Sequence, residues 1–312
     1  MKVLFSVFVL VFSGLVAAKT LHEPLHNIVV FGDSLSDNGN LYEHLEHKVP
    51  PSPPYHAGRF TDGQVWVEHL VESYFPCNGA AHLLDYAFGG AGISEEDDDV
   101  LFTLNREIQI YLDAHQGKAD PYSLFVVWIG ANNYLGVPDE DMVEKTLREV
   151  NVGIQHGLQR LVAAGAKHIL VVNLPDLGQT PMAREFDAQE KMTYLSEQHN
   201  KQLAEKVSEL QRTYQNVQWL YFDVHGTLNE LLITPEAYGF KNITDTCYNV
   251  MVEKPNQQSV LRMAARARLK NKRNVCEGYL FFDLVHPTLP AHQIMAERAK
   301  GFLDMAGIQF TD

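Results

Sequence analysis

Short apolar runs alternate with longer amphipathic stretches along most of the chain. Runs of five to seven residues rich in Val, Ile, Leu and Phe are typical of buried strands. They predict five strands, at residues 27–31, 83–88, 123–129, 168–173 and 217–222. The run at 123–129 is apolar at successive positions, which indicates a strand covered on both faces and therefore a parallel sheet.

The stretches between these runs repeat apolar residues every three or four positions, as a helix with one buried face does. They predict helices over 63–74, 101–115, 140–164 and 187–214, and a last helix that follows Pro287 and runs to about Met305. Gly165 follows the longest of these helices and is placed to end it. Strand and helix alternate throughout, so the sequence predicts a doubly wound α/β fold, a three-layer αβα sandwich around a mostly parallel sheet.

The first eighteen residues have the pattern of an export signal. Lys2 precedes a short apolar stretch, and Ala17-Ala18 provides the small residues of a cleavage site before Lys19. The alternative is a membrane anchor, but the stretch is shorter than the ~20 apolar residues that a span needs. No later apolar run reaches that length, so we expect an exported mature chain without a transmembrane segment. We find no internal repeat or break in composition, and expect residues 19–312 to form one domain.

The composition narrows the classes of partner. The chain has 312 residues, 46% of them hydrophobic, and a net charge of −14, which removal of Lys2 takes to about −15. So acidic a protein is a poor candidate for binding nucleic acid and is not attracted to anionic lipid surfaces. Neutral or zwitterionic substrates suit it better. No His/Cys cluster has zinc spacing, so we expect no metal, and we expect no cofactor.

The chain contains three cysteines, Cys77, Cys247 and Cys276, and export favours a disulfide. Three pairings are possible. Cys247 and Cys276 bracket a loop-like insert at about 241–278, so we favour that pair and expect Cys77 to stay free. The insert carries seven Lys and Arg residues between these cysteines against a single acid, Glu253. Such a run is a solvated surface, or a mobile cap that contacts phosphate or is cut by a protease.

Four polar features stand at predicted strand ends or in a loop that can reach them. Ser34 follows the first strand, Gly90 the second and Asn132 the third, while Asp283 and His286 lie just before the last helix. In open parallel sheets, ligands bind at the carboxyl ends of the strands. Each feature alone has an ordinary structural explanation, as a turn, a cap or a backbone partner.

Together these residues predict a hydrolase that forms an acyl-enzyme. A serine needs a base to become a nucleophile, and His286 is the candidate for Ser34. Asp283 is the candidate to orient the imidazole and to stabilise its charged form. The N–H groups of Ser34 and Gly90 and the side-chain amide of Asn132 are the candidate oxyanion-hole donors.

The same motifs resemble the GDSL, or SGNH, family of lipases and esterases. Ser34 lies in Gly-Asp-Ser-Leu, Gly90 in Gly-Gly-Ala, Asn132 in Gly-Ala-Asn and His286 in Asp-x-x-His, in family order. The resemblance covers nearly the whole mature chain and implies the SGNH fold and these catalytic roles. Two positions depart from the usual pattern: Asn133 stands where an acid is common and Asp85 where Asn is common.

Within that family, the Ser-Asp-Asn-Gly-Asn stretch at 36–40 and the acidic, exported character look most like a bacterial branch. That branch holds secreted lysophospholipases A, phospholipases A and glycerophospholipid–cholesterol acyltransferases, some with a disulfide-closed loop before the last motif. The resemblance implies a lipid ester as substrate, presented at a membrane surface or in a micelle, and a secreted or periplasmic enzyme of a Gram-negative bacterium.

Four functions remain open from the sequence. The first is hydrolysis of the acyl ester of lysophospholipids or phospholipids, and the second is transfer of the same acyl group to a sterol or another alcohol. The third is a carbohydrate O-acetyl esterase, because fold does not determine substrate. The fourth is a binding module with an inactive site, which the complete set of candidate residues disfavours. The oligomeric state is not readable from the sequence.

Overall fold

The computed structural model describes residues 23–93, 102–247 and 276–312. Its centre is a sheet of five strands, and each neighbouring pair is parallel. The strands are β1 (Asn27–Gly32), β2 (Leu83–Asp85), β3 (Ser123–Trp128), β4 (His168–Val172) and β5 (Gln218–Phe222), in the spatial order β2-β1-β3-β4-β5. This topology confirms the predicted α/β class, and all five strands lie where the apolar runs predicted them.

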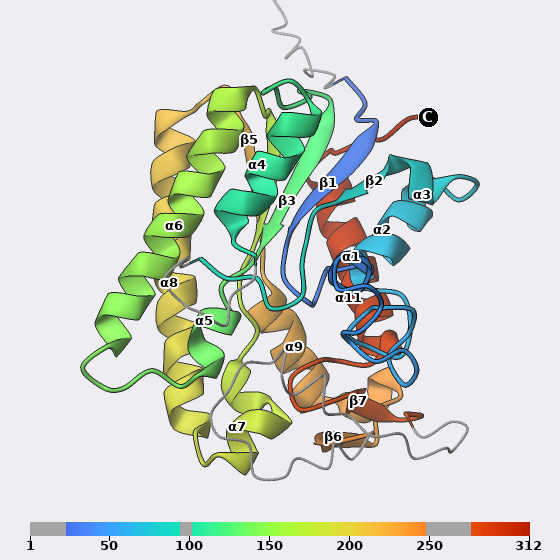
Figure 1. The fold of residues 1–312 in the computed structure, drawn as a ribbon, viewed down its shortest axis with the longest axis vertical. Helices are drawn as coiled ribbons and strands as arrows, with labels where there is room; N and C mark the ends of the chain where they lie inside the picture. Colours follow the sequence, from blue (N-terminus) through green and yellow to red (C-terminus); the bar gives the residue numbers. More distant parts are fainter. Residues whose placement is uncertain (1–22, 94–101, 248–275) are drawn as a thin grey trace, which may run out of the picture.

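Three long helices cover one face of the sheet (Figure 1). They are α4 (Leu104–Ala114), α6 (Val143–Ala164) and α8 (Gln189–Thr213). Their apolar stripes pack on side chains such as Phe31 and Phe125, which point to this face. The α6 helix ends at Gly165, whose φ of 120° is readily adopted only by glycine, as the sequence predicted.

Two helices, α2 (Trp66–Tyr74) and α11 (Leu289–Met305), cover the opposite face. Val30 and Val126 point to this side and share a core with Leu70 of α2 and Ala299 of α11. All six residues of β3 are buried, because helices lie on both of its faces. That burial explains why its sequence is apolar without alternation.

The strand predicted at 83–88 is shorter than expected, and β2 ends at Asp85. Tyr86 and Phe88 still donate N–H bonds to the carbonyl oxygens of Val30 and Gly32. The Ala87 N–H instead donates to Oδ1 of Asp85, at 2.9 Å. A side chain that captures its own backbone in this way competes with the regular ladder.

Several short elements were not predicted. They are α1 (Asn40–His44), α3 (Gly79–His82), α5 (Asn132–Leu135), α7 (Pro181–Glu185) and α9 (Val224–Ile233), with 3-10 turns at Leu177–Gln179 and Pro235–Tyr238. The longest, α9, starts directly after β5, where Oδ1 of Asp223 accepts the Gly226 N–H at 3.0 Å. The helix α3 directly precedes β2, whereas the other short elements lie in connections that follow the carboxyl ends of strands (Figure 1).

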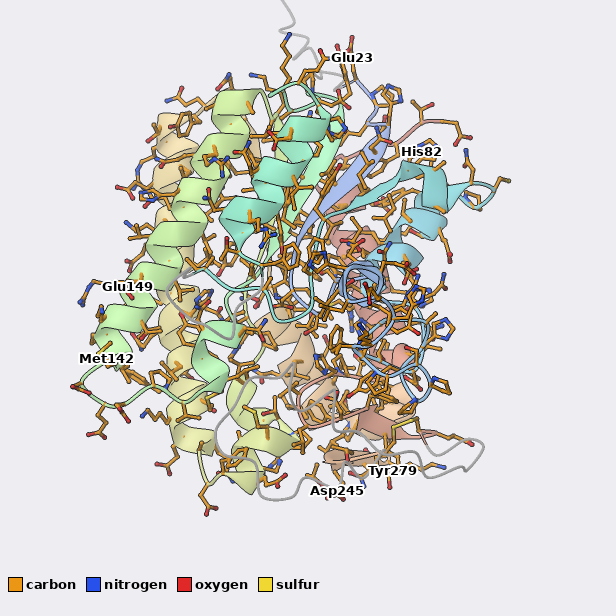
Figure 2. All side chains as sticks on the ribbon, viewed as in Figure 1. Glu23, His82, Met142, Glu149, Asp245 and Tyr279 are labelled. Carbon is orange, nitrogen blue, oxygen red and sulfur yellow. A yellow bond between two sulfur atoms is a disulfide. The ribbon has the colours of Figure 1, made fainter. Side chains whose placement is uncertain are left out.

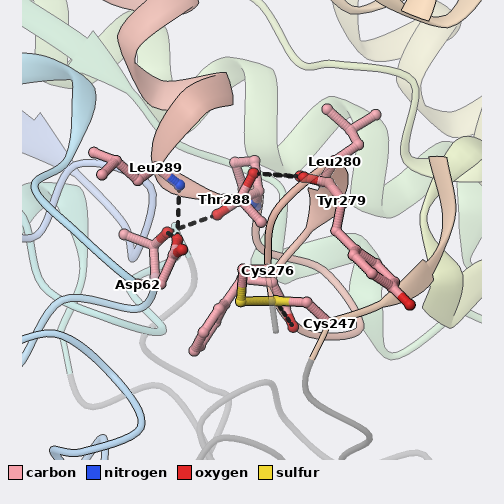
Figure 3. Close-up of a disulfide and its surroundings, with 10 residues drawn as sticks. Asp62, Cys247, Cys276, Tyr279, Leu280, Thr288 and Leu289 are labelled. Atoms are coloured by element: carbon pink, nitrogen blue, oxygen red, sulfur yellow. Dashed lines mark hydrogen bonds between the residues drawn. A yellow bond between two sulfur atoms is a disulfide. The ribbon is translucent and has the colours of Figure 1, made fainter. Parts of the chain in front are cut away.

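A second, parallel two-stranded sheet lies beyond that end, formed by β6 (Asn242–Thr246) and β7 (Tyr279–Phe281). Asp245 and Tyr279 mark this sheet in Figure 2. Next to it, Cys247 and Cys276 form the disulfide that the sequence favoured (Figure 3). Cys77 is free and exposed.

Two sequence predictions, the export signal at 1–18 and the basic stretch between Cys247 and Cys276, lie outside the described residues. None of the helices within the described ranges combines the length and the apolar character of a bilayer span.

Candidate active site

Ser34 lies in a tight turn at the carboxyl end of β1, the strand between β2 and the central strand β3. The Asp33 carbonyl oxygen accepts the N–H groups of Ser36 and Asp37, each at 3.0 Å. The Asp33 carboxylate also accepts the Leu35 N–H at 3.1 Å. These bonds turn the chain sharply just where the strand ends, so Ser34 is held at the edge of the sheet and is 5% exposed.

The structure brings Ser34, His286 and Asp283 together in one chain of hydrogen bonds. The Ser34 Oγ lies 2.7 Å from His286 Nε2. The other ring nitrogen, Nδ1, lies 2.8 and 2.7 Å from Oδ1 and Oδ2 of Asp283. This is the geometry in which a carboxylate orients an imidazole and the imidazole takes a proton from a hydroxyl.

Local hydrogen bonds shape the loop that carries Asp283 and His286. Asp283 Oδ1 accepts the main-chain N–H groups of Val285 and His286, at 3.0 and 2.8 Å. The Phe282 N–H donates to the His286 carbonyl oxygen at 2.8 Å. The Asp-x-x-His spacing therefore folds back on itself, and the acid meets the base three residues later.

The loop is also tied to the elements on either side of it (Figure 3). The Thr288 hydroxyl donates to the Tyr279 carbonyl oxygen at 2.8 Å, and the Leu289 N–H, at the start of α11, donates to Asp62 Oδ1 at 2.7 Å. The Cys247 N–H donates to the carbonyl oxygen of Phe281 at 3.1 Å. The small sheet and its disulfide thus hold the start of this loop.

Asp283 is buried, yet it has the properties of an ionised group. Burial by itself raises the pKa of its carboxyl. The positive charge of protonated His286, and hydrogen bonds from His286, Tyr55 and the Val285 N–H, outweigh burial and bring that pKa below its usual range. An ionised partner is what a histidine acting as a base requires.

The candidate oxyanion donors occupy the neighbouring loops. Asn132 starts α5 directly after β3 and lines the same pocket as Ser34 and His286. Its Nδ2 donates to the Ala91 carbonyl oxygen at 2.8 Å, which orients the amide and uses one of its two protons. Gly90 precedes Ala91 and has a φ of 77°. Among the described residues, no acceptor is bound to the N–H of Ser34 or Gly90.

The two departures from the family pattern have structural roles here. Asn133 Oδ1 accepts the Ile93 N–H at 3.1 Å, so a neutral amide provides the acceptor at this position. Asp85 accepts two main-chain N–H groups, from Ala87 and from Asn38 at 3.1 Å. Both side chains support the loops around Asn132 and Gly90 rather than the reacting groups.

The carboxyl groups of Asp33, Asp37 and Glu107 are buried beneath these loops, and Asp85 is half-buried beside them. Burial raises the pKa of Asp33 and of Asp37 to about 6, and it holds the pKa values of Asp85 and Glu107 well above their usual range. Repulsion between neighbouring acids contributes to these raised pKa values: Asp37 acts on Asp33 and on Asp85, and Asp33 and Asp85 act on Glu107. Within the part of the chain that the structure describes, no group of three His, Cys, Asp or Glu residues is arranged to hold a metal ion.

A mainly apolar pocket begins at Ser34 and His286. Much of its apolar wall comes from three elements that follow the main sheet in the sequence. They are α9, with Val224, Leu228 and Leu231; β7, with Leu280 and Phe281; and α11, with Ala291 and Met295. The few polar side chains of the lining include Asp176, Thr180 and Thr227. A pocket of this kind accommodates an apolar group next to the serine.

Some residues of the site have no clear signal in the sequence. The Tyr55 hydroxyl donates to Asp283, but the two residues are 228 positions apart in the sequence. The α9 wall of the pocket was not predicted, because apolar residues cover this short helix without a clear polar face. Asp37 lies in a stretch that the sequence marked by resemblance, and only the structure shows which N–H groups it binds.

A parallel α/β sheet with a serine, a histidine and an aspartate joined by hydrogen bonds at its carboxyl edge is an arrangement typical of serine hydrolases. The sequence profile of the GDSL-like Lipase/Acylhydrolase family matches residues 28–299. The chain therefore belongs to this family.

Several relatives are similar over most of the chain. It is 32% identical to the phosphatidylcholine-sterol acyltransferase of Aeromonas hydrophila, over 93% of this chain and 95% of the relative. It is 25% identical to the secreted effector protein SseJ of Salmonella typhimurium and 27% identical to the thermolabile hemolysin of Vibrio parahaemolyticus, over 88% of this chain in both cases. The chain spans 63% of the length of each of these last two proteins.

Among solved structures, the chain is similar to an acetylxylan esterase from Geobacillus stearothermophilus. The two are 14% identical, with a TM-score of 0.49 over 94% of this chain and 99% of the esterase.

Proposed function

We propose that the protein is a secreted serine esterase that cleaves the acyl ester of lysophospholipids and phospholipids through an acyl-enzyme on Ser34. One observation carries the proposal: the Ser34 hydroxyl, hydrogen-bonded to His286, stands at the start of an apolar pocket. An acyl chain fits such a lining, because its transfer from water is favourable by about 0.8 kcal/mol per buried CH₂.

In the proposed reaction, Ser34 Oγ attacks the ester carbonyl carbon while its proton passes to His286 Nε2. Asp283 keeps the Nδ1 proton in place and stabilises the imidazolium. The negative charge on the carbonyl oxygen is met by the N–H groups of Ser34 and Gly90 and by the second amide proton of Asn132. His286 then protonates the leaving alcohol, and water attacks the acyl-enzyme by the reverse route.

Acyl transfer to a sterol or another alcohol is the second candidate. The similarity to a phosphatidylcholine-sterol acyltransferase over nearly the full length of both chains favours it. The two functions share the acyl-enzyme and differ only in whether water or another alcohol takes the acyl group. Export of the chain, proposed from residues 1–18, is supported by its similarity to the secreted effector protein SseJ.

The test is fatty-acid release by the purified chain, with lysophosphatidylcholine, a diacyl phosphatidylcholine and an acetylated sugar assayed in parallel. We expect release from the lysolipid, and a loss of at least about a thousandfold in Ser34→Ala. Cholesterol is added in a parallel reaction, and appearance of a cholesteryl ester would favour the acyltransferase. Activity on the acetylated sugar alone, or an unchanged rate in Ser34→Ala, would contradict the proposal.

A second variant tests the pocket itself. Leu231→Phe adds bulk to the α9 wall, so we expect the rate on a long-chain lysolipid to fall about tenfold while a short-chain ester is spared. Ile233→Phe, on the exposed side of the same helix, is the matched control. Equal loss on short and long chains in Leu231→Phe would argue against the pocket as the acyl site.

A further inference from the structure

The carboxylate of Asp283 receives a hydrogen bond that no part of the Asp-x-x-His motif supplies. The Tyr55 hydroxyl donates to Asp283 Oδ2 at 2.6 Å, across 228 positions of sequence. We propose that Tyr55 is a positioning residue for the reaction, which locks the Asp283 carboxylate in the orientation that His286 needs. The proposal rests on the function proposed above for Ser34, Asp283 and His286.

The Tyr55 hydroxyl completes the set of donors around Asp283. Oδ1 accepts the N–H groups of Val285 and His286 from its own loop. Oδ2 has no main-chain donor among the described residues, and its partners are His286 Nδ1 at 2.7 Å and the Tyr55 hydroxyl. Without the hydroxyl, one oxygen would be held only by the ring that it is meant to orient.

Packing leaves the Tyr55 side chain little freedom to move. It is 2% exposed, and its ring meets Phe282 edge-on with 5.0 Å between centroids, and Phe60 at 6.1 Å. Phe60 in turn packs on the His286 ring at 5.3 Å. The hydroxyl thus stands at a defined place beside the catalytic acid, which is the condition for one group to position another.

The segment 55–62, which carries Tyr55, forms further hydrogen bonds with the residues that follow His286. The Thr61 hydroxyl donates to the carbonyl oxygen of Pro287 at 2.8 Å, and Asp62 accepts the Leu289 N–H. Tyr55 is the member of this segment whose hydrogen bond reaches the catalytic carboxylate itself. If Tyr55 only packs against its neighbours, loss of its hydroxyl should leave the pH profile of the reaction unchanged. If it acts through Asp283, the pH profile should change.

The difference appears in the pH profile. A hydrogen bond to Asp283 draws charge from the carboxylate and weakens its support of protonated His286. Loss of the Tyr55 hydroxyl should therefore move the acid limb of kcat/KM to higher pH. Among the described residues, the ionisable groups Asp33 and His292 also interact with His286, and both remain in place in the variant.

The test is Tyr55→Phe, which keeps the buried ring and removes only the hydroxyl. The substrate is p-nitrophenyl butyrate, a soluble ester, so the result does not depend on lipid preference. We expect kcat to fall about tenfold with KM nearly unchanged, since a hydrogen bond to a charged group is lost from the transition state. We also expect the acid limb to move to higher pH.

Tyr74→Phe is the matched control. The Tyr74 hydroxyl donates to Asp304 Oδ1 at 2.8 Å, so this variant also breaks a tyrosine–aspartate bond, but one between α2 and α11. We expect its kcat and its acid limb to match those of the wild type. Ser34→Ala is assayed beside it, and an unchanged rate in that variant would overturn the proposed function. If Ser34→Ala is inactive but Tyr55→Phe keeps the kcat and the acid limb of the wild type, only the role of Tyr55 is overturned.

A lowered kcat in Tyr55→Phe with an unmoved acid limb would assign Tyr55 to packing alone and also overturn the proposal. If Tyr55→Phe does not fold, 3-fluorotyrosine is placed at position 55. Its more acidic hydroxyl is a stronger donor and keeps the contacts of the ring. The acid limb should then move to lower pH, and a shift to higher pH or none would reject the proposal.

Discussion

The Asp37 carboxylate accepts the main-chain N–H of Gly89 at 2.7 Å, and so joins the loop after β1 to the loop after β2. The same side chain accepts the N–H groups of Gly39, Asn40 and Leu41, at 2.8, 2.6 and 3.2 Å. One buried carboxylate thereby binds both the start of α1 and the residue next to Gly90. The family-like stretch at 36–40 has a structural reason: its acid connects the two loops beside the serine.

Asp37→Asn tests this connection. The substitution turns one acceptor oxygen into a donor that faces N–H groups, so we expect the free energy of unfolding to fall by about 1–3 kcal/mol. Displacement of Gly89 should lower kcat as well, because Gly90 is a proposed oxyanion donor. Denaturant unfolding and ester hydrolysis measure the two effects.

Asp113→Asn is the control for the change in charge, since Asp113 is exposed and bonds only the side chain of Gln109 among the described residues. The free energy of unfolding of this variant should stay within about 0.5 kcal/mol of that of the wild type. Asp37→Asn with the same small effect would show that the connection contributes little.

Asn132→Ala removes the proposed side-chain donor of the oxyanion hole. We expect kcat on p-nitrophenyl butyrate to fall about 100- to 1000-fold while KM changes little, because the donor acts on charge that develops in the transition state. Steady-state kinetics measure both constants.

Asn133→Asp is the neighbouring control. It restores the acid that is common in the family and keeps an oxygen to accept the Ile93 N–H, so we expect a rate close to the wild type. If Asn132→Ala instead raises KM and leaves kcat unchanged, Asn132 acts in substrate binding and not in the oxyanion hole.

His199 makes the stability of the fold sensitive to acid. It is buried in α8, its Nδ1 lies 2.9 Å from the Tyr134 hydroxyl of α5, and burial lowers its pKa from 6.5 to about 3. Below pH 6.5 the His199 side chain is therefore protonated in the unfolded chain, whereas in the folded chain it stays neutral until about pH 3. The free energy of unfolding falls through that window, by at most about 1.4 kcal/mol per pH unit for this group.

His199→Asn removes the titrating group. We expect the variant to be less stable at pH 7 but to lose less stability than the wild type between pH 6.5 and pH 4.5. His292, and the carboxyls of Asp33 and Asp37, also titrate between the folded and unfolded states, but they are common to both proteins and cancel in the comparison. Parallel curves for the variant and the wild type would refute the role of His199, and the exposed His156→Asn should give such parallel curves.

The sequence by itself determined the sheet, its long helices and the candidate residues of the site. The five strands and five long helices are visible locally, because each buries a stripe or a run of apolar residues that repeats with its own period. The candidates Ser34, Asn132, Asp283 and His286 follow from their position at strand ends and in a short motif. The preference for Cys247–Cys276 followed from the insert that they bracket, and the structure contains that disulfide.

Only the tertiary structure decided what surrounds those residues. The bond from Tyr55 to Asp283 joins positions 228 apart, and nothing within either segment indicates the other. The apolar wall of α9 became visible only once β5 had placed that helix beside β7 and α11. Local periodicity shows that a face is buried, but the identity of its partner depends on how distant segments pack, and that is settled by the fold as a whole.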